Sequence, residues 1–449
     1  MAEMIKIRKG LDIKLEGKAE EQILSTPKAE LFALKPTDFH GLTPKLLLKP
    51  GEKVKVGTPV FYDKYNPNIL FVSPVSGEVV DVVRGERRRI LEVVVKSDGK
   101  MTAEDLGKSD VSKMKREEVV EKIQQAGMWP FIKQRPYDVI AKADKEPKAV
   151  FISGLDTAPL APNYNFILQD KGKELQEGIN ILKKLTKGKI HLSVDGNSSA
   201  KVFKALKGVD LHEVSGPHPA GNVGIQIHHI DAINKDEVVW VINPQDVAAL
   251  GSLFLNGKYD PLRTIAVTGS ELKKTGYYNI VIGMSVTPFV ADNLKSTNPR
   301  VISGNVLTGT KISKDGYLGS YHHQITVIPE GDHFEFMGWA NPGFNKFSIH
   351  GNVFSSFLGK KLWRLDANLN GGHRALVMSG EYDKVLPMDV LPEFLLKAVI
   401  VKDIDKMEQL GIYEIAPEDM ALCEVVCTSK TEVQKIIREG LDLMIQELG

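Results

Sequence analysis

Cysteine is almost absent from this sequence of 449 residues: only Cys423 and Cys427 are present, near the carboxyl end. A [4Fe–4S] cluster needs four thiolates, usually from one run of closely spaced cysteines, and a C-x3-C pair supplies only the last spacing of such a run. Two cysteines also exclude a disulfide framework, so a reducing compartment is favoured. We interpret both as packing thiols, and a disulfide between them stays open.

Long apolar runs and an excess of charge of either sign are also missing. The first ten residues are followed by charged residues and contain no apolar core of signal-peptide length. Apolar runs such as residues 238–242 have the length of a strand, far below the ~20 residues that cross a bilayer. Lys and Arg total 58 against 57 for Asp and Glu, so the chain has no excess of positive charge that would indicate nucleic-acid binding. Any association with a membrane must therefore come through a partner protein.

The length predicts several domains, and the first of them is rich in β-structure. A chain of this size divides into about three or four domains of roughly 100–150 residues. Residues 49–60 and 72–80 each lead from a Gly-containing turn into alternating apolar residues, as short strands do. They resemble the G-D-x-V-x-x-G and A-P-x-x-G-x-V elements of barrel-sandwich (biotinyl and lipoyl) domains. Lys64 lies where such carriers bear the modified lysine, but it lacks flanking methionines, so a solvated turn lysine is favoured and a carrier is the alternative.

Residues 101–257 alternate between strands and helices. Apolar residues at Leu175, Ile179 and Leu182 recur at helical spacing, and short apolar runs between such stretches predict buried strands. The pattern predicts a Rossmann-like parallel α/β domain, in which ligands bind beyond the carboxyl ends of the strands. The predicted strands are 149–153, 191–194, 209–214 and 238–242, and the loops that follow the first three are 154–159, 195–199 and 215–224.

Both common phosphate-binding motifs are missing from this domain. Gly221-x-x-Gly224 lacks the first glycine of G-x-G-x-x-G. Residues 251–258 miss the P-loop spacing by one position, and Tyr259 follows where a P-loop has Ser or Thr. Two hypotheses stay open at this point: a scaffold without a tightly bound cofactor, and an autonomous flavoenzyme that binds FMN or NADH in remodelled loops.

The rest of the chain divides into a β-rich unit and a mixed unit. Residues 258–328 contain two predicted strands, 263–270 and 276–285, and resemble the soluble-ligand-binding β-grasp (SLBB) domain of the flavin subunit of respiratory complex I. Residues 430–448 carry apolar positions at helical spacing, which predicts a terminal helix. The sequence therefore predicts a multidomain α/β chain with units at residues 1–100, 101–257, 258–328 and 329–449.

The order of these units resembles that of RnfC-type subunits and of the A subunits of the bacterial Na+-translocating NADH:quinone reductases. In flavin-bearing relatives a G-x-G-G-A-x-F-P-T loop holds the FMN phosphate. Residues 126–133 match that loop, but Met128 and Trp129 stand in its glycine region and would block the close approach of the phosphate. The chain is instead identified as a member of the A-subunit family on residues 218–221 (His-Pro-Ala-Gly), 225–229, 300–309, 335–339 and 421–427.

The resemblance implies a peripheral subunit on the cytoplasmic face of the bacterial inner membrane, held there by other subunits of a six-subunit complex. Such a complex passes electrons from NADH to quinone and exports Na+. Its flavins and iron–sulfur centre are expected in other subunits, so this chain would carry no tightly bound cofactor and would not be catalytic in isolation. The resemblance also raises quinone contact as a role of this chain.

The eleven histidines include the adjacent pairs His228-His229 and His322-His323. Neighbouring side chains point to different faces of a helix or opposite faces of a strand, so such a pair rarely chelates one ion. Hydrogen-bonding roles are therefore predicted, and no metal site. His218 is the exception because it lies in a loop after a strand, and we place His218 and Gly221 among the candidate contacts of a quinone or a partner.

Residues 334–357 hold six of the seventeen phenylalanines together with Trp339. Core packing is the favoured interpretation of this density. The alternative is an aromatic docking surface for membrane partners or a pocket for a quinone ring, which needs apolar walls and one or two hydrogen-bond donors. On that alternative, Phe336, Trp339 and Phe344 join the candidate contacts.

Overall fold

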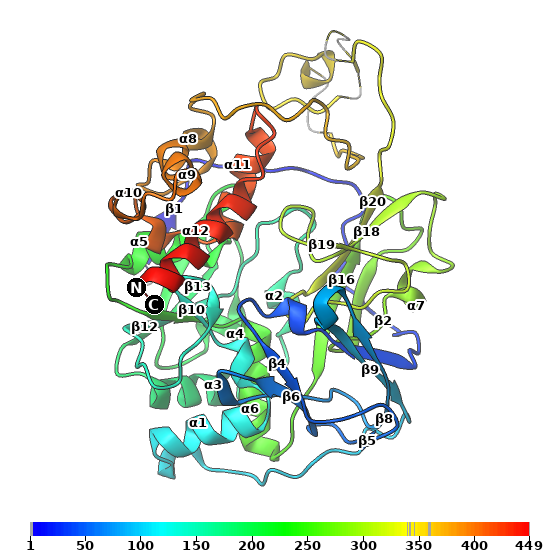
Figure 1. The fold of residues 1–449 in the computed structure, drawn as a ribbon, viewed down its shortest axis with the longest axis vertical. Coiled ribbons are helices and arrows are strands. Elements are labelled where there is room, and N and C mark those ends of the chain that lie inside the picture. Colours follow the sequence, from blue (N-terminus) through cyan, green and yellow to red (C-terminus); the bar gives the residue numbers. More distant parts are fainter. Residues whose placement is uncertain (1–2, 339, 341–342, 345, 358–360, 449) are drawn as a thin grey trace.

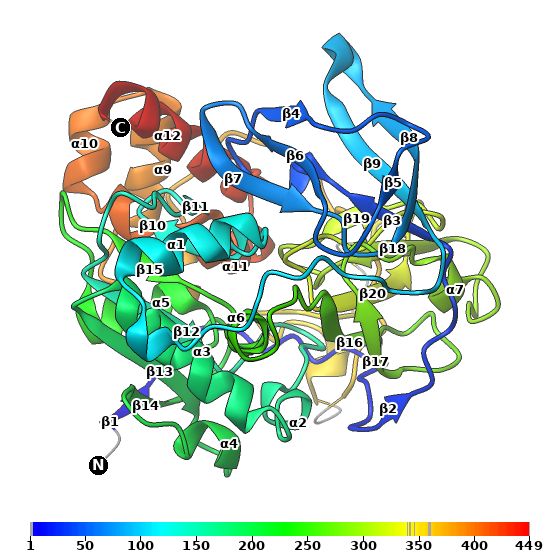
Figure 2. The ribbon, with the colours of Figure 1, turned by 90° about the horizontal axis from the view of Figure 1, so that it is seen from below.

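The structure is a computed structural model that describes residues 3–338, 340, 343–344, 346–357 and 361–448. Within these residues the strands form sheets of seven, six, four and three strands. Figures 1 and 2 show the N-terminal strands and the six-stranded sheet beside the α/β domain, with the orange and red C-terminal helices near α5 and β10. The predicted multidomain α/β class is confirmed.

The two smaller sheets form the predicted barrel-sandwich domain. Its hairpins pair antiparallel, β6 with β7 and β8 with β9. A Cβ on Gly77 would lie 1.9 Å from the carbonyl oxygen of Lys96, so the close approach of β8 to β9 at this position requires glycine. Lys64 is exposed in the turn between β6 and β7, the position of a solvated turn lysine. The strands are β3 (Leu31–Leu34), β4 (Pro44–Leu46), β5 (Lys53–Val54), β6 (Pro59–Asp63), β7 (Asn66–Val72), β8 (Gly77–Arg84) and β9 (Ile90–Ser97).

The seven-stranded sheet of the α/β domain has the order β1-β14-β13-β12-β15-β10-β11. Its first five strands are mutually parallel, as predicted, whereas β10 runs antiparallel to β15 and β11 antiparallel to β10. The strands are β1 (Glu3–Lys6), β10 (Lys133–Arg135), β11 (Val139–Ile140), β12 (Ala149–Ser153), β13 (Lys189–Asp195), β14 (Asp210–Ser215) and β15 (Val239–Val241).

Alternate residues of β12 face two different helix layers. Val150 and Ile152 belong to the core that contains the apolar face of α3, while Phe151 packs on the side of α5. A Cβ on Gly251 would lie 1.9 Å from the carbonyl oxygen of Glu174, so α3 and α6 pack in backbone contact. The helices are α1 (Arg116–Gln125), α2 (Tyr164–Ile167), α3 (Gly172–Leu185), α4 (Lys201–Lys204), α5 (Val223–Asp231) and α6 (Pro244–Asn256).

The first 24 residues add strands to two sheets other than the barrel. β1 pairs with β14 at the edge of the seven-stranded sheet, and β2 pairs with β17 in the six-stranded sheet. The six-stranded sheet has the order β19-β18-β20-β16-β17-β2. Its elements are β2 (Ile23–Leu24), β16 (Leu262–Thr268), β17 (Gly276–Val281), α7 (Thr287–Val290), β18 (Pro299–Ser303), β19 (Thr310–Ile312) and β20 (Gln324–Pro329).

The C-terminal helices enclose a second core that contains both cysteines. Cys423 and Cys427 are free and buried, as the interpretation of both as packing thiols expects. Burial raises the pKa of the Cys423 thiol, and the Tyr382 hydroxyl donates a hydrogen bond of 2.9 Å to the sulfur of Cys427. The helices are α8 (Tyr382–Val385), α9 (Pro392–Ile400), α10 (Ile404–Gln409), α11 (Ala421–Val426) and α12 (Val433–Leu448), the last of which confirms the predicted terminal helix.

Candidate functional site

A cavity of about 220 Å³ lies beyond the carboxyl ends of β12 and β15. The sheet order reverses here, because β13 and β14 lie on one side of β12 and β15 lies on the other. Open α/β sheets bind their ligands at such a reversal. Ser153, the last residue of β12, and Asp156 in the loop that follows it line the cavity. Ile242 and Asn243, which follow β15, and Gly221, in the loop after β14, also line it.

The remaining walls come from three other parts of the chain. Phe131 and Tyr321 supply aromatic surface, with their ring centroids 6.1 Å apart. Leu307 lies in the loop between β18 and β19, and Glu418 belongs to the C-terminal unit. The cavity therefore has both apolar walls and hydrogen-bonding groups, and it depends on more than one domain.

Two of the predicted contact residues, His218 and Gly221, line this cavity. A hydrogen bond of 3.1 Å joins His218 Nδ1 to Thr157 Oγ1, and the Gly221 N–H donates to the same hydroxyl at 2.8 Å. Burial lowers the pKa of His218 to about 4, so the ring is neutral at neutral pH. A Cβ on Gly221 would lie 2.5 Å from the Thr157 nitrogen, so only glycine allows the two loops this close.

The predicted aromatic contacts lie elsewhere, on a segment that extends beyond β20 at the top of Figure 1. Phe336 is 92% exposed and Phe344 is 65% exposed, and Trp339 lies outside the described residues. The favoured interpretation of this segment as core packing is wrong for most of its phenylalanines, because Phe334, Phe336, Phe344, Phe354 and Phe357 are exposed. Phe347 is the exception, since its ring packs against Trp363 with centroids 5.7 Å apart.

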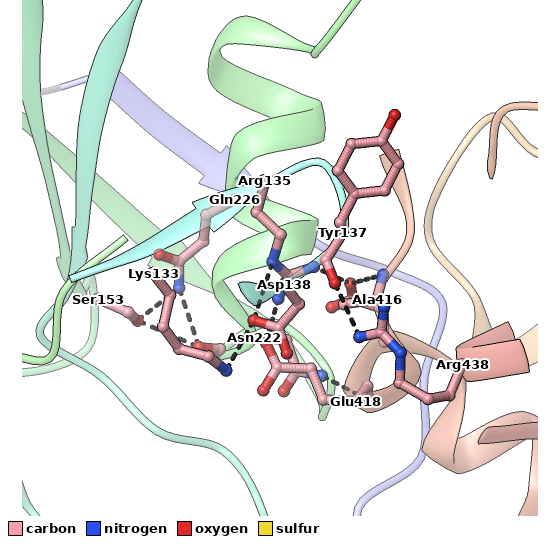
Figure 3. Close-up of polar contacts among 12 residues, drawn as sticks. Lys133, Arg135, Tyr137, Asp138, Ser153, Asn222, Gln226, Ala416, Glu418 and Arg438 are labelled. Carbon is pink, nitrogen blue, oxygen red and sulfur yellow. Dashed lines mark hydrogen bonds and ion pairs between the residues drawn. The ribbon is translucent and has the colours of Figure 1, made fainter. Parts of the chain in front are cut away.

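One wall of the cavity is held by a buried ion network around Arg135 (Figure 3). The Arg135 side chain is 2% exposed, and its guanidinium donates to the carboxylates of Asp419, at 2.9 Å, and Glu418. Lys133 pairs with Asp138 at 2.7 Å, and Arg438 donates to the Tyr137 carbonyl oxygen at 2.7 Å. These contacts fasten the C-terminal helices to β10 and to the turn that follows it.

The carboxylates of the network and the cavity have unequal proton affinities. Burial raises the pKa of Glu418; the Arg135 guanidinium lowers it, and the carboxylates of Asp419 and Asp138 raise it. Burial also acts on Asp138, but Lys133 and Arg135 hold the pKa of that carboxyl well below its usual range. Burial raises the pKa of Asp156, which accepts a hydrogen bond from the Ala158 N–H. Burial also raises the pKa of Asp246, so three carboxyl groups with raised pKa values line the cavity.

The segment that matches a flavin phosphate loop does not fit a phosphate. Met128 and Trp129 are fully buried, and the Trp129 indole donates to the Ala141 carbonyl oxygen at 2.8 Å and packs edge-on against Trp240. A Cβ on Gly127 would lie 2.7 Å from the methyl groups of Val72. Side chains of the barrel and of the α/β domain therefore fill the space that a phosphate would need.

The paired histidines form hydrogen bonds within the protein, as predicted. His228 Nδ1 lies 2.7 Å from Glu414, and His229 Nε2 lies 2.9 Å from the carbonyl oxygen of Pro387. His322 Nδ1 lies 2.8 Å from the Ser303 hydroxyl. In the part of the chain that the structure describes, no group of three or more His, Cys, Asp or Glu side chains is placed to hold a metal ion.

Comparison with known proteins gives three family matches along the chain. Residues 5–98 match the NqrA N-terminal barrel-sandwich hybrid domain, residues 114–259 the NqrA second alpha/beta domain, and residues 264–314 the NQRA C-terminal domain. The chain is 37% identical over 448 residues to the A subunit of the Na(+)-translocating NADH-quinone reductase of Neisseria meningitidis serogroup B, covering 99% of this chain and 100% of the relative. It is 36% identical over 447 residues to that of Histophilus somni, with the same coverage.

The chain also has a distant likeness to a solved structure. An NAD+-reducing [NiFe]-hydrogenase in the H2-reduced state aligns with 67% of this chain and 55% of its own, at a TM-score of 0.35 and 12% identity. Such a likeness carries no conclusion about function. None of the helices among the described residues is long and apolar enough to span a bilayer.

Proposed function

The chain belongs to the NqrA family, the A subunits of the Na+-translocating NADH-quinone reductases, and we propose that it serves such a complex as its peripheral, quinone-contacting component. In this role the chain lies on the cytoplasmic face of the bacterial inner membrane, among the other members of a six-subunit assembly. Electron transfer from NADH and export of Na+ then require redox centres and ion paths in those partners.

The observation that carries the quinone role is the cavity at the reversal of the sheet order. A quinone ring needs flat apolar walls and hydrogen-bond donors for its carbonyl oxygens. Phe131 and Tyr321 supply the aromatic surface, and Leu307 closes the cavity from the β-grasp side. Polar side chains after β12 and β15 face the same space. A ring bound there would contact both the α/β domain and the β-grasp domain.

The proposal also assigns no tightly bound flavin to this chain. Met128 and Trp129 fill the place of the phosphate loop, and the sheet carries no glycine-rich motif that would replace it. The flavins and the iron–sulfur centre of the complex would accordingly reside in partner subunits. An autonomous FMN- or NADH-dependent enzyme is the rival hypothesis, and it predicts a flavin or nicotinamide that copurifies with the full-length chain.

Filling part of the cavity should weaken quinone binding. In the Leu307→Trp variant, the larger side chain would occupy part of the 220 Å³ that the ring needs. We expect its Kd for a short-tailed benzoquinone, measured by equilibrium dialysis with the full-length chain, to rise at least about tenfold. The matched control is Leu262→Trp, because Leu262 is exposed and lies outside the cavity. Equal binding by both variants would overturn the cavity as the quinone site.

We further propose that the exposed phenylalanines of residues 334–357 are covered by an apolar surface of a partner subunit. Exposed apolar surface often marks an interaction site, and aromatic residues are enriched at interface cores. Met337 is also exposed on this segment, and an ion pair of 2.8 Å between Lys346 and Glu335 adds a polar rim. These features are typical of a protein interface.

Polar substitutions on this surface should therefore impair assembly. In the double variant Phe336→Ser, Phe344→Ser, we expect recovery of the assembled complex by affinity purification to fall at least about fivefold, since exposed aromatic anchors carry much of an interface's binding energy. The melting temperature of the isolated chain should stay unchanged because both rings are exposed. Phe347→Ser is the contrasting variant, because that ring packs within the chain. Undiminished assembly of the double variant would refute the docking surface.

A further inference from the structure

His323 holds a buried N–H donor in a fixed orientation beside the cavity. The Gln245 side chain bridges two groups of the Thr264 backbone: its Oε1 accepts from the N–H at 2.9 Å, and its Nε2 donates to the carbonyl oxygen at 2.9 Å. A flipped amide would oppose like groups at both contacts, so the assignment is determined by the backbone. The same Nε2 lies 3.0 Å from His323 Nδ1. That nitrogen must accept, and the proton of the neutral ring is therefore on Nε2.

The Nε2–H of His323 has no hydrogen-bond partner among the described residues. The side chain lines the cavity and is only 8% exposed, so bulk water does not readily satisfy this donor. Burial, with the charges of Arg263 and His322, lowers the pKa of His323 to about 3, which keeps the ring neutral at neutral pH. A buried donor without a partner requires an explanation, and a ligand in the adjacent cavity is one.

Tyr164 supplies a second oriented donor next to the first. Asn243 caps α6 by accepting the Gln245 N–H on Oδ1 at 2.9 Å, so its Nδ2 points the other way and donates to the Tyr164 hydroxyl at 2.8 Å. The hydroxyl oxygen is therefore an acceptor there, and no described residue accepts its proton. The Tyr164 and His323 rings lie edge to face with centroids 6.2 Å apart, and both line the cavity.

We propose that His323 Nε2–H and Tyr164 O–H are the donors that position a carbonyl oxygen of the quinone in this cavity. The inference rests on the proposed function and adds to it the two positioning residues and the part of the ligand that they recognise. α6 organises the arrangement, because Asn243 at its N-terminus and Gln245 in its first turn orient the two side chains. The pair selects for an acceptor atom, so it discriminates between a quinone and a ring that lacks carbonyl oxygens.

Single-atom changes test the pair with the full-length protein and a short-tailed benzoquinone as probe. Loss of one neutral hydrogen bond should weaken binding roughly three- to tenfold, so we expect this rise in Kd for both Tyr164→Phe and His323→Leu. His323→Gln, which retains a side-chain N–H, should recover part of the affinity. Tyr277→Phe is the matched control, because that buried hydroxyl accepts the Asn163 N–H and lies outside the cavity.

An infrared difference spectrum of the bound quinone separates positioning from a purely structural effect. Hydrogen bonds lower the carbonyl stretching frequency, so the band should move to higher frequency in Tyr164→Phe and His323→Leu and stay in place in Tyr277→Phe. If the wild-type chain binds no quinone, the proposed function fails and this inference fails with it. If the wild type binds and the two variants match it in Kd and band position, or if Tyr277→Phe loses as much affinity, only this inference is overturned.

Discussion

Replacing Asp419 with alanine is expected to lower the free energy of unfolding by about 3–5 kcal/mol, the usual cost of removing one partner of a buried ion pair. The Asp419 side chain is fully buried and lies 2.9 Å from the guanidinium of Arg135, which is itself 2% exposed. The variant would leave Arg135 with only Glu418 and, at 3.7 Å, Asp138 as partners. Asp419 also accepts the Ala416 N–H, so a backbone donor would lose its partner as well. Urea denaturation followed by circular dichroism measures the loss.

Asp442→Ala is the matched control for this prediction. Asp442 pairs with Arg438 at 3.0 Å, but its side chain is partly exposed, and such pairs contribute about 0–1 kcal/mol. A cost for Asp419→Ala no greater than that for Asp442→Ala would show that the Arg135 network does not hold the C-terminal helices. If the network does hold them, Asp419→Ala should also weaken quinone binding, because Glu418 on the same turn lines the cavity.

The α/β domain is predictable from local sequence because burial imposes a period on its elements. The predicted strand 149–153 coincides with β12, and Leu175, Ile179 and Leu182 form the buried face of α3. β1 and β10 could not be predicted in this way, because strands of four and three residues are too short to show a period. Their pairing also depends on distant partners, as Glu3 lies opposite His212. The parallel core of the sheet could therefore be predicted, but not its edges.

The candidate site divides in the same way. His218 and Gly221 were accessible to sequence reasoning because loops after parallel strands gather at one edge of the sheet. Arg135, Tyr164 and His323 carry no local signal, since their roles arise from partners far along the chain, such as Asp419 for Arg135. The aromatic segment shows a different limit. Its composition indicates apolar surface, but composition alone does not say whether that surface is buried within the chain or presented to a partner.

Acidification from pH 7 to pH 5 is expected to destabilise the protein steeply through three histidines whose pKa values are lowered in the folded chain. Burial lowers the pKa values of His218 and His322 to about 4 and that of His323 to about 3, against 6.5 for an unperturbed ring. Between these values the unfolded chain binds more protons than the folded chain, so their stabilising contribution is complete above pH 6.5 and is lost as the pH falls toward 4. In this window each ring lowers the free energy of unfolding by up to about 1.4 kcal/mol per pH unit of acidification. At pH 5 the loss is about 2 kcal/mol per ring.

Substitution of a single ring isolates its share of this loss. In His322→Asn, the side-chain oxygen can replace Nδ1 as the partner of the Ser303 hydroxyl, but the side chain does not titrate. The variant should start less stable at pH 7 and then lose about 2 kcal/mol less than the wild type between pH 7 and pH 5, as measured by urea denaturation at both pH values. His40→Gln is the control, because His40 is exposed. A pH dependence in His322→Asn as steep as in the wild type would mean that the His322 ring can take up a proton without unfolding the chain.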